Sequence, residues 1–281
     1  MTRVAAIDIG TNTTRLLVAD VADGRVDELT RQSVVTRLGE GVDAKRLLLP
    51  ASIARVHAAL DGFRAEIDAL GAEHTLAVAT SAVRDAGNGT AFLEEIGSRY
   101  GFATRLLSGE EEAALTRSGV GAVDEGTLVV DIGGGSTELI LGEVRVSLDV
   151  GSVRLTERYL SSDPPTRGEL EVAAAFVRSL LPQLDVTAAI GVAGSVAQLS
   201  VLVGKLTLDA VEAELELLAS LPLLERQVVP NLDPGRAPVI VAGALIIACI
   251  LRRYRLSTLA YSVRDLLDGV ALEAARVREE T

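Results

Sequence analysis

The sequence is poor in several residue types that carry common chemistry. Its 281 residues include one cysteine, two histidines and no tryptophan, and aromatic residues make up 3% of the chain. The single cysteine, Cys249, excludes an intrachain disulfide, and because it stands in an apolar run it is expected to be a buried, inert thiol. His57 and His74 have no neighbouring metal-ligand pattern, which argues against a histidine–aspartate metal phosphohydrolase.

Positive charge is also scarce. The chain has 27 Lys and Arg against 39 Asp and Glu, a net charge of −12, and it lacks the basic patch expected of a nucleic-acid-binding protein. Nucleic acid is therefore not an expected partner, and any polyanion must be held locally by backbone amides, a few arginines and metal. Lys45 and Lys205 are the only lysines, so arginine, the better residue for bidentate phosphate contacts, supplies nearly all positive charge.

Long hydrophobic runs are missing as well. The longest, Val239 to Leu251, is too short to span a bilayer, so we expect it to be a buried helix. The chain begins directly with a predicted strand and shows no signal peptide. We therefore expect a soluble, cytoplasmic protein with no membrane partner. Hydrophobic residues still make up 48% of the chain, so aliphatic side chains are expected to fill a substantial core.

A glycine-rich stretch from Thr127 to Gly142 reads TLVVDIGGGSTELILG. This pattern predicts a strand, a glycine turn and a second strand. Glycines lack a Cβ, so the backbone can approach a ligand closely and direct several N–H groups at one point. Ser136 and Thr137 add hydroxyl donors, and Asp131 and Glu138 add two carboxylates. Together these groups suit a phosphate chain that carries Mg²⁺.

The same design occurs at the start of the chain, from Val4 to Val18. Both copies contain Asp-Ile-Gly, then a threonine (Thr14 or Thr137) four residues after the first glycine, and a leucine two residues further on. Two ordinary β-hairpins with glycine turns are the alternative. The matched hydroxyls and acids favour an internal repeat, which indicates two related half-domains that face one cleft.

The remaining sequence alternates predicted strands with predicted helices, which indicates an α/β fold. A composition shift from Gly119 to Gly126 marks a domain boundary. Further strands are expected near residues 26–29, 75–80, 103–107, 144–150, 188–193 and 258–261. Helices are expected at 50–70, from about 90, from 108, from 151, from 166 to about 181, after 195, at 208–221, 223–229 and 235–253, and at the C-terminus.

Two predicted helices begin with capping-box patterns, Ser108 with Glu111 and Thr166 with Glu169. The first box gives Glu111 a structural role, which leaves the adjacent Glu112 to point into the cleft.

Two strand ends carry further candidates. Arg84 follows one strand and could clamp a phosphate, although an exposed arginine without a ligand is equally compatible, and Asn88 could cap the next helix. Gly194-Ser195 follows a later strand and could hold a phosphate or ribose, but close packing explains it as well.

Several reactions are excluded by missing motifs. The chain has no Gly-Lys-Ser/Thr, so it has no Walker A loop, and its glycines lie between strands rather than at the start of a helix, which argues against a Rossmann fingerprint. Phosphoryl transfer by positioning and electrostatics remains, and it needs a group that deprotonates the nucleophile. The carboxylate candidates for this base are Glu112, Glu138, Asp8 and Asp131.

These motifs resemble those of the exopolyphosphatase / guanosine-pentaphosphate phosphatase (Ppx/GppA) family, within the actin–sugar kinase–Hsp70 group of folds. The matching stretches follow the family's order and cover nearly all of the chain; they are AAIDIGTNTTRLLV, RLGEGVD, ATSAVRDAGNG, SGEEEA, VVDIGGGSTELI, GSVRLTE, GVAGS and SVRDLLDG. The resemblance implies two actin-like (ribonuclease H-like) α/β domains around an interdomain cleft, residues 1–122 and 123–281. The C-terminal helix would lie in the second domain or pack back on the first.

The resemblance also implies a set of site residues. Glu112 would be the catalytic base, and Glu138 would serve both the water and the metal. Mg²⁺, or Mn²⁺, would be held by Asp131, Glu138 and Asp8. The phosphate-binding candidates are Gly10, Thr11, Asn12, Thr13, Arg15, Arg84, Gly133, Gly134, Gly135, Ser136 and Arg154.

The chain departs from the family pattern in two places. Its first loop reads Thr11-Asn12-Thr13 where the family more often has Ser-Asn-Ser, so the hydroxyls are kept. It also stops at Thr281, without the helical C-terminal extension of longer members, from which we expect a preference for short polyphosphate chains.

The activity that the resemblance implies is Mg²⁺-dependent release of terminal orthophosphate from inorganic polyphosphate. Alternatives are removal of the 5′-γ-phosphate of guanosine pentaphosphate (pppGpp), a non-catalytic sensor of (p)ppGpp or polyphosphate, and an actin-like ATPase or sugar kinase. A homodimer is expected from the resemblance alone.

Overall fold

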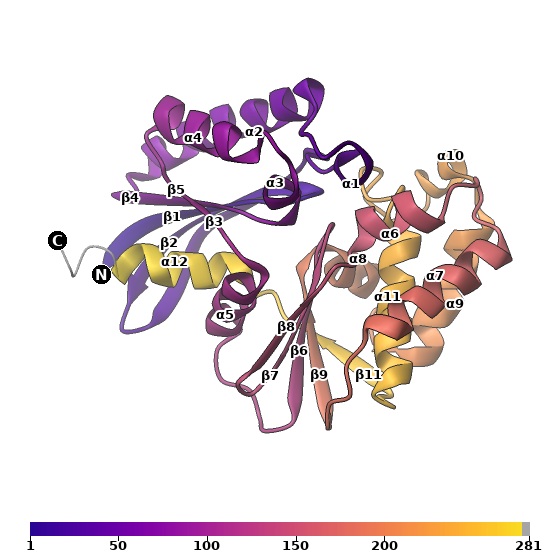
Figure 1. Ribbon diagram of the computed structural model, residues 1–281. Coiled ribbons are helices and arrows are strands. Elements are labelled where there is room, and N and C mark those ends of the chain that lie inside the picture. Colours follow the sequence, from indigo (N-terminus) through magenta and orange to yellow (C-terminus); the bar gives the residue numbers. More distant parts are fainter. Residues whose placement is uncertain (277–281) are drawn as a thin grey trace. The chain divides into compact units, whose positions relative to one another are not determined.

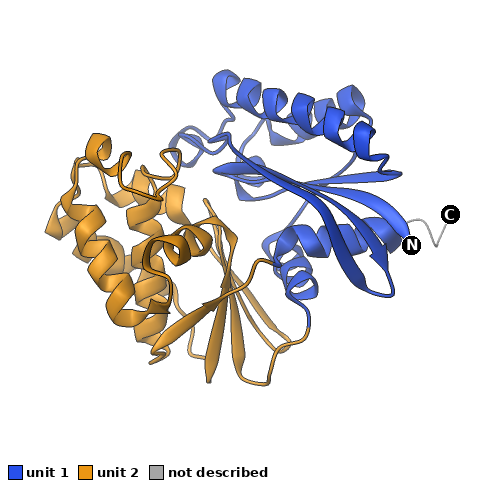
Figure 2. Ribbon diagram, turned by 180° about the vertical axis from the view of Figure 1, so that it is seen from behind, with its two compact units in different colours: residues 1–121, 264–281 blue, residues 122–263 orange. Residues whose placement is uncertain are grey.

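The computed structural model describes residues 1–276, and the chain divides into two compact units (Figure 2). Unit 1 comprises residues 1–121 and 264–281, and unit 2 comprises residues 122–263. The division therefore lies one residue before the boundary expected from the sequence. The C-terminal helix packs back on the first domain, which is one of the two positions expected for it.

Unit 1 is built on a five-stranded sheet of order β3-β2-β1-β4-β5 (Figure 1). Its strands are β1 (Thr2–Ile9), β2 (Thr13–Ala22), β3 (Arg25–Val35), β4 (His74–Ala79) and β5 (Ala103–Leu106). Its helices are α1 (Val42–Lys45), α2 (Pro50–Leu70), α3 (Ser81–Asp85), α4 (Gly89–Tyr100), α5 (Gly109–Val120) and α12 (Leu266–Arg276).

Unit 2 has a six-stranded sheet of order β10-β11-β9-β6-β7-β8. Its strands are β6 (Thr127–Ile132), β7 (Thr137–Leu141), β8 (Val144–Leu148), β9 (Ala188–Val192), β10 (Leu206–Thr207) and β11 (Thr258–Tyr261). Its helices are α6 (Ser152–Tyr159), α7 (Arg167–Leu180), α8 (Ala193–Val203), α9 (Leu208–Ser220), α10 (Leu223–Arg226) and α11 (Ile240–Arg253).

The two sheets share one topology. In each, three antiparallel strands form a meander, β1-β2-β3 or β6-β7-β8, and two further strands lie parallel beside the first of them. The order β3-β2-β1-β4-β5 therefore matches β8-β7-β6-β9-β11. This match confirms the internal repeat and makes the two glycine-turn hairpins equivalent elements of the two units.

The sheet of unit 1 is covered on both faces. Alternate residues of a strand point to opposite faces, so Ala5 and Ile7 of β1 join a core with Phe63 of α2. Val4 and Ala6 join a second core with the apolar side chains of α12. This second core explains why residues 264–276 belong to unit 1 rather than to unit 2.

Two glycines let α12 cross α5 at very short range. A Cβ on Gly269 would overlap the carbonyl oxygen of Leu115, and a Cβ on Gly119 would lie 2.7 Å from the Gly269 amide nitrogen. The backbones of the two helices are therefore in direct contact, and the crossing tolerates no side chain at either position.

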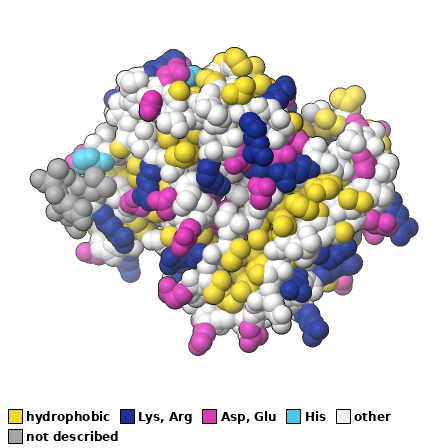
Figure 3. Space-filling model, in the orientation of Figure 1, with side chains coloured by type: hydrophobic (Ala, Val, Ile, Leu, Met, Phe, Trp, Pro, Cys, Tyr) yellow, Lys and Arg dark blue, Asp and Glu magenta, His cyan; other side chains and the backbone are white. Residues whose placement is uncertain are grey.

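Unit 2 has an aliphatic core, as the low aromatic content predicts. Its main cluster joins strand residues such as Leu128 and Val130 to the buried faces of α8 and α11, and Cys249 lies within it. None of the helices within residues 1–276 is both long enough and apolar enough to cross a membrane. On the face seen in Figure 3, acidic and basic side chains lie interspersed.

Some predicted boundaries were wrong. The third strand runs over Arg25–Val35 rather than near 26–29, α10 ends at Arg226 rather than 229, and α11 begins at Ile240 rather than 235. Residues 234–239 form turns instead, where Pro238 cannot donate a backbone hydrogen bond. The sequence also missed α3, which is too short to show a helical repeat.

Asn88 precedes α4 as predicted, but its side chain does not cap that helix. Its Oδ1 accepts a hydrogen bond from the Leu48 N–H at 2.8 Å, and its Nδ2 donates to the Leu48 carbonyl at 3.0 Å. Asn88 therefore ties a distant loop to α4.

We predict that Gly269→Ala lowers the free energy of unfolding by about 1–3 kcal/mol, because the added methyl group overpacks the α5–α12 crossing. Urea denaturation measures this change. Gly62→Ala is the matched control, since Gly62 is an exposed residue of α2 with nothing within 4 Å of an added Cβ. That variant should gain up to about 1 kcal/mol; equal losses in both variants would contradict the tight crossing.

Candidate active site

The turn of the first hairpin joins β1 to β2, and a neighbouring segment fixes its carbonyl groups. The Asn12 carbonyl accepts a hydrogen bond from the Thr36 N–H at 3.0 Å, and the Thr11 carbonyl accepts one from the Gly39 N–H at 2.8 Å. The Asn12 side chain is buried, yet its Nδ2 has no hydrogen-bond partner among the described residues. Because buried donors are rarely left unpaired, this amide is a natural donor to an anion.

Asp8, at the end of β1, lies directly opposite Arg15 of β2 in the strand register. Arg15 donates to Asp8 Oδ2 from Nε at 3.0 Å and from Nη2 at 2.8 Å, and it also donates from Nη1 to Asp265. Asp8 Oδ1 has no hydrogen-bond partner within residues 1–276. Burial raises the pKa of the Asp8 carboxyl above its ordinary value, and the Arg15 guanidinium offsets only part of that increase.

The structure brings Arg84 and Glu112 together. Arg84 comes from α3, directly after β4, and Glu112 comes from the first turn of α5. Arg84 Nη1 lies 3.7 Å from Glu112 Oε2 and donates to the Leu107 carbonyl at 2.6 Å. The Glu112 side chain is 8% exposed, against 29% for Arg84. Unit 1 therefore holds a buried carboxylate beside a more accessible guanidinium.

The capping box next to Glu112 is confirmed. Ser108 Oγ accepts a hydrogen bond from the Glu111 N–H at 3.2 Å, and Glu111 Oε2 accepts one from the Ser108 N–H at 2.8 Å. The Ser108 backbone bond, with help from Arg105, lowers the pKa of Glu111 to about 2. Glu111 is thus a structural acid, whereas its neighbour Glu112 is buried. The second predicted box, Thr166 with Glu169, is confirmed as well.

The second glycine turn is held by the start of α6. The Ser152 N–H donates to the Gly133 carbonyl at 3.0 Å, and the Val153 N–H donates to the Gly134 carbonyl at 2.8 Å. With these carbonyls engaged, the N–H groups of Gly134 and Gly135 make no hydrogen bond to any part of the chain that the structure describes. Two adjacent N–H groups without partners in a glycine turn form the kind of concavity that binds anions.

Asp131 of β6 lies directly opposite Glu138 of β7. The two side chains therefore share one face of the sheet, opposite the face on which Val130 and Leu139 join the core. Both acids are buried, at 4% and 0% exposure, and Ser147 Oγ donates to Glu138 Oε1 at 2.7 Å. Two buried carboxylates side by side repel each other, and a bound cation would relieve this repulsion.

This acid pair is the element most suited to hold a metal. Among residues 1–276 there is no group of three or more His, Cys, Asp and Glu side chains that could hold a metal ion. Mg²⁺ fits such a setting because it usually binds through one or two carboxylates and completes its shell with water and substrate phosphate. Asp131 and Glu138 therefore fit Mg²⁺, whereas Asp8, the third predicted ligand, is paired with Arg15.

The sequence model of the Ppx/GppA phosphatase family matches residues 17–276. This chain belongs to the Ppx/GppA phosphatase family. It is 38% identical to Exopolyphosphatase 2 of Mycobacterium tuberculosis, over 98% of this chain and 99% of that protein. The crystal structure of an exopolyphosphatase-like protein superposes with a TM-score of 0.92 at 30% identity, and the match covers 99% of this chain and 100% of the other.

A relative named for a different substrate also matches the chain. The guanosine-5′-triphosphate,3′-diphosphate pyrophosphatase of Vibrio vulnificus is 30% identical over 96% of this chain, which spans 58% of that longer protein. The resemblance seen in the motifs is thus confirmed. Together with the repeated strand order, it establishes an α/β fold of two units that share one topology.

In this Ppx/GppA protein, Arg154 forms a hydrogen bond to the second loop. Its Nε donates to the Gly135 carbonyl at 2.7 Å, and its Nη1 lies 2.7 Å from Asp149 Oδ1. The side chain is 8% exposed. The structure therefore gives Arg154 a part in holding the loop, and its contact with phosphate stays a prediction.

At Gly194-Ser195 the structure shows close packing. A Cβ on Gly194 would lie 2.6 Å from Arg236 Nη2, and a Cβ on Gly243 of α11 would lie 2.8 Å from Ser195 Oγ. These contacts favour the packing explanation, and a role in holding phosphate or ribose stays a prediction.

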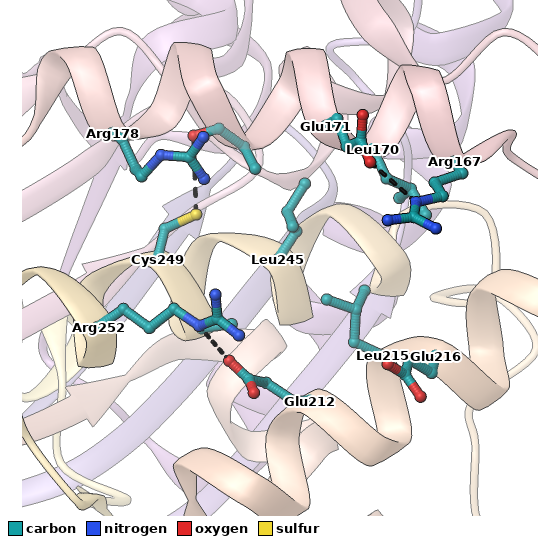
Figure 4. A pocket seen from close by; sticks show the side chains of 12 residues that line it. Arg167, Leu170, Glu171, Arg178, Glu212, Leu215, Glu216, Leu245, Cys249 and Arg252 are labelled. Carbon is teal, nitrogen blue, oxygen red and sulfur yellow. Dashed lines mark hydrogen bonds and ion pairs between the residues drawn. The ribbon is translucent and has the colours of Figure 1, made fainter.

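Cys249 is one of the residues that line a groove of about 300 Å³ between α7, α9 and α11 (Figure 4). Burial raises the pKa of its thiol to about 11, so the thiolate is scarce at neutral pH. Some of the charged residues that line the groove pair with one another, as Arg167 does with Glu171. This agrees with the prediction of a buried, inert thiol.

The sequence missed Asp265, although the stretch SVRDLLDG was among the family matches. Its Oδ1 accepts a hydrogen bond from the Leu267 N–H at 2.9 Å, and its own N–H donates to Asp268 Oδ2 at 3.0 Å. The spacing Asp-x-x-Asp at a helix start is a local cap signal that could have drawn attention to it. Its bond to Arg15 has no local signal.

We predict that Gly151→Ala weakens tripolyphosphate binding by about tenfold or more. An added Cβ would lie 2.5 Å from the Gly134 carbonyl carbon and 2.6 Å from the Gly135 nitrogen, so the second loop must move. Isothermal titration measures the affinity. Gly168→Ala, where nothing lies within 4 Å of an added Cβ, is the control. Unchanged affinity in a folded Gly151→Ala protein would show that this loop does not bind phosphate.

Proposed function

We propose that this protein is a Mg²⁺-dependent exopolyphosphatase, which hydrolyses the terminal phosphoanhydride bond of inorganic polyphosphate. The observation that carries the proposal is the second loop, where two N–H groups that bond to no residue within 1–276 lie next to a pair of buried acids. Phosphoryl transfer needs such donors for phosphate oxygens together with carboxylates for a metal. The name of the 38% identical Mycobacterium tuberculosis relative supports the same substrate.

Phosphate binding is assigned to both glycine turns. In the first, the Asn12 amide would donate to phosphate oxygens, with hydroxyls from Thr11 and Thr13. In the second, the N–H groups of Gly134 and Gly135 would donate, with Ser136 beside them. The Arg84 guanidinium supplies the positive charge that an overall acidic chain needs at the phosphate.

Glu112 is assigned as the general base. A water oxygen forms a bond to the terminal phosphorus while the bond from that phosphorus to the bridging oxygen breaks. The water proton passes to the Glu112 carboxylate, and the bridging oxygen leaves with the shortened chain. The products are orthophosphate and a polyphosphate that is one phosphate shorter.

Asp131 and Glu138 are assigned to hold Mg²⁺, or Mn²⁺ in its place. When bound, the ion neutralises charge on the phosphate oxygens. The Ser147 hydroxyl fixes one oxygen of Glu138, which orients this carboxylate.

A second substrate has support of its own. The Vibrio vulnificus relative is named for action on guanosine-5′-triphosphate,3′-diphosphate and matches 96% of this chain at 30% identity. The same groups would then release the 5′-γ-phosphate of pppGpp, because both substrates end in a phosphoanhydride. A homodimer is expected from the family, and the mass in solution tests it.

We predict that Glu112→Gln lowers the rate of orthophosphate release by about 10²–10⁴-fold, because the amide cannot accept the water proton. Tripolyphosphate, long-chain polyphosphate and pppGpp are compared as substrates with Mg²⁺ present. Affinity, measured by isothermal titration, should stay within about threefold of wild type.

Glu111→Gln is the matched control, since it removes the neighbouring acid from the same helical turn. It should weaken the cap, and so stability, while the rate per folded molecule is kept. Full activity of Glu112→Gln would overturn the assignment of the base. Binding without release from any of the three substrates by the wild-type protein would favour a sensor.

We predict that Asp131→Asn raises the Mg²⁺ concentration for half-maximal activity by at least about tenfold, because one of two metal-binding carboxylates is lost. EDTA should abolish release, and Mn²⁺ should restore it. Glu143→Gln removes an exposed acid from the same β7–β8 region and should leave the Mg²⁺ dependence unchanged. An unaltered Mg²⁺ dependence in Asp131→Asn would rule out this metal site.

A further inference from the structure

We propose that Asp265 is a positioning residue for the first phosphate-binding turn, acting through Arg15 on Asp8. The inference rests on the proposed function, since it assumes that this turn binds phosphate. Asp265 lies 250 positions after Arg15 and belongs to neither glycine turn.

The guanidinium of Arg15 is held between two carboxylates. Its Nε and Nη2 both donate to Asp8 Oδ2, at 3.0 and 2.8 Å, while Nη1 donates to Asp265 Oδ2. The guanidinium is planar and its donors form a rigid fork, so a bond at Nη1 fixes the direction of the other two. Asp265 therefore sets the angle at which Arg15 meets Asp8.

Because these three side chains are buried, water cannot readily replace a hydrogen bond lost between them. The side chain of Arg15 is 16% exposed, and those of Asp8 and Asp265 are each 7% exposed. Little water is available to take over a lost bond, so an unpaired donor there must find another protein acceptor. Asp8 Oδ1, which has no partner among residues 1–276, is an acceptor of that kind on the carboxylate that Arg15 already contacts.

Asp265 is itself held rigidly. Its Oδ1 accepts from the Leu267 N–H at 2.9 Å, its N–H donates to Asp268 at 3.0 Å, and Arg31 Nη1 lies 3.6 Å from Oδ1. These contacts fix Asp265 at the start of α12, whose glycine crossing with α5 prevents the helix from shifting.

Asp8 lies under the first turn, since a Cβ on Gly10 would be 3.7 Å from Asp8 Oδ1. With Asp265 present, Arg15 uses only the other oxygen of Asp8. Without it, Arg15 can swing to bind both oxygens of Asp8, which would rotate this carboxylate beneath Gly10 and move the turn. On this basis Arg15, which the sequence suggested as a phosphate ligand, serves to hold Asp8.

The test compares Asp265→Asn with Asp20→Asn. Asparagine keeps an oxygen for the Leu267 cap but removes the charge that holds Arg15. Asp20→Asn also removes a carboxylate that pairs with an arginine of unit 1, Arg3 at 2.8 Å, at the end of the β1–β2 pair opposite the turn. We expect Asp265→Asn to lower kcat/KM for tripolyphosphate by about tenfold or more. Asp20→Asn should stay within about twofold, at a similar melting temperature.

A double-mutant cycle separates positioning from a purely structural role. If Asp265 acts through Arg15, Asp265→Asn adds no further loss in an Arg15→Gln background. Additive losses, equal losses in Asp265→Asn and Asp20→Asn, or an unchanged Asp265→Asn would each overturn the inference. If the wild-type protein releases no phosphate, the proposed activity fails, and the same cycle is then read from tripolyphosphate affinity by isothermal titration.

Discussion

Both units depend on how a buried aspartate at the end of a strand is compensated. In two equivalent hairpins the same register position faces this aspartate, and it holds Arg15 opposite Asp8 but Glu138 opposite Asp131. A buried charge is costly without a partner. The first unit places an arginine there, and the second places a second acid, which gives the pair to which we assign Mg²⁺. One position in a repeated motif thus decides whether an arginine or a second acid faces the buried aspartate.

Much of this arrangement could be predicted from short patterns. The capping boxes at Ser108 and Thr166 and the two Asp-Ile-Gly turns are local, so a few neighbouring residues define them. The proximity of Arg84 to Glu112 followed only from the family, because it needs the position of β4 relative to α5. The bond between Arg15 and Asp265 could not be predicted, since no local pattern encodes a partner 250 residues away.

The glycines show most clearly why the residue type alone does not predict the role of a position. Gly134 has an N–H that bonds to none of the described residues, Gly151 lets the start of α6 approach that turn, and Gly269 lets two helix backbones touch. In the sequence all three are simply positions without a side chain. Only the neighbouring atoms show which glycine concerns a ligand and which concerns packing.

The discontinuity of unit 1 has a consequence for the protein as it is made. Residues 1–121 leave the ribosome first, but α12, whose buried face completes their second core, is translated only after the whole of unit 2. Unit 2 is continuous and can fold while synthesis proceeds. The nascent chain therefore carries Arg15 and Asp8 without Asp265 until the residues after unit 2 emerge. A protein cut short before α12 would keep every glycine-turn motif and still lack a finished first unit.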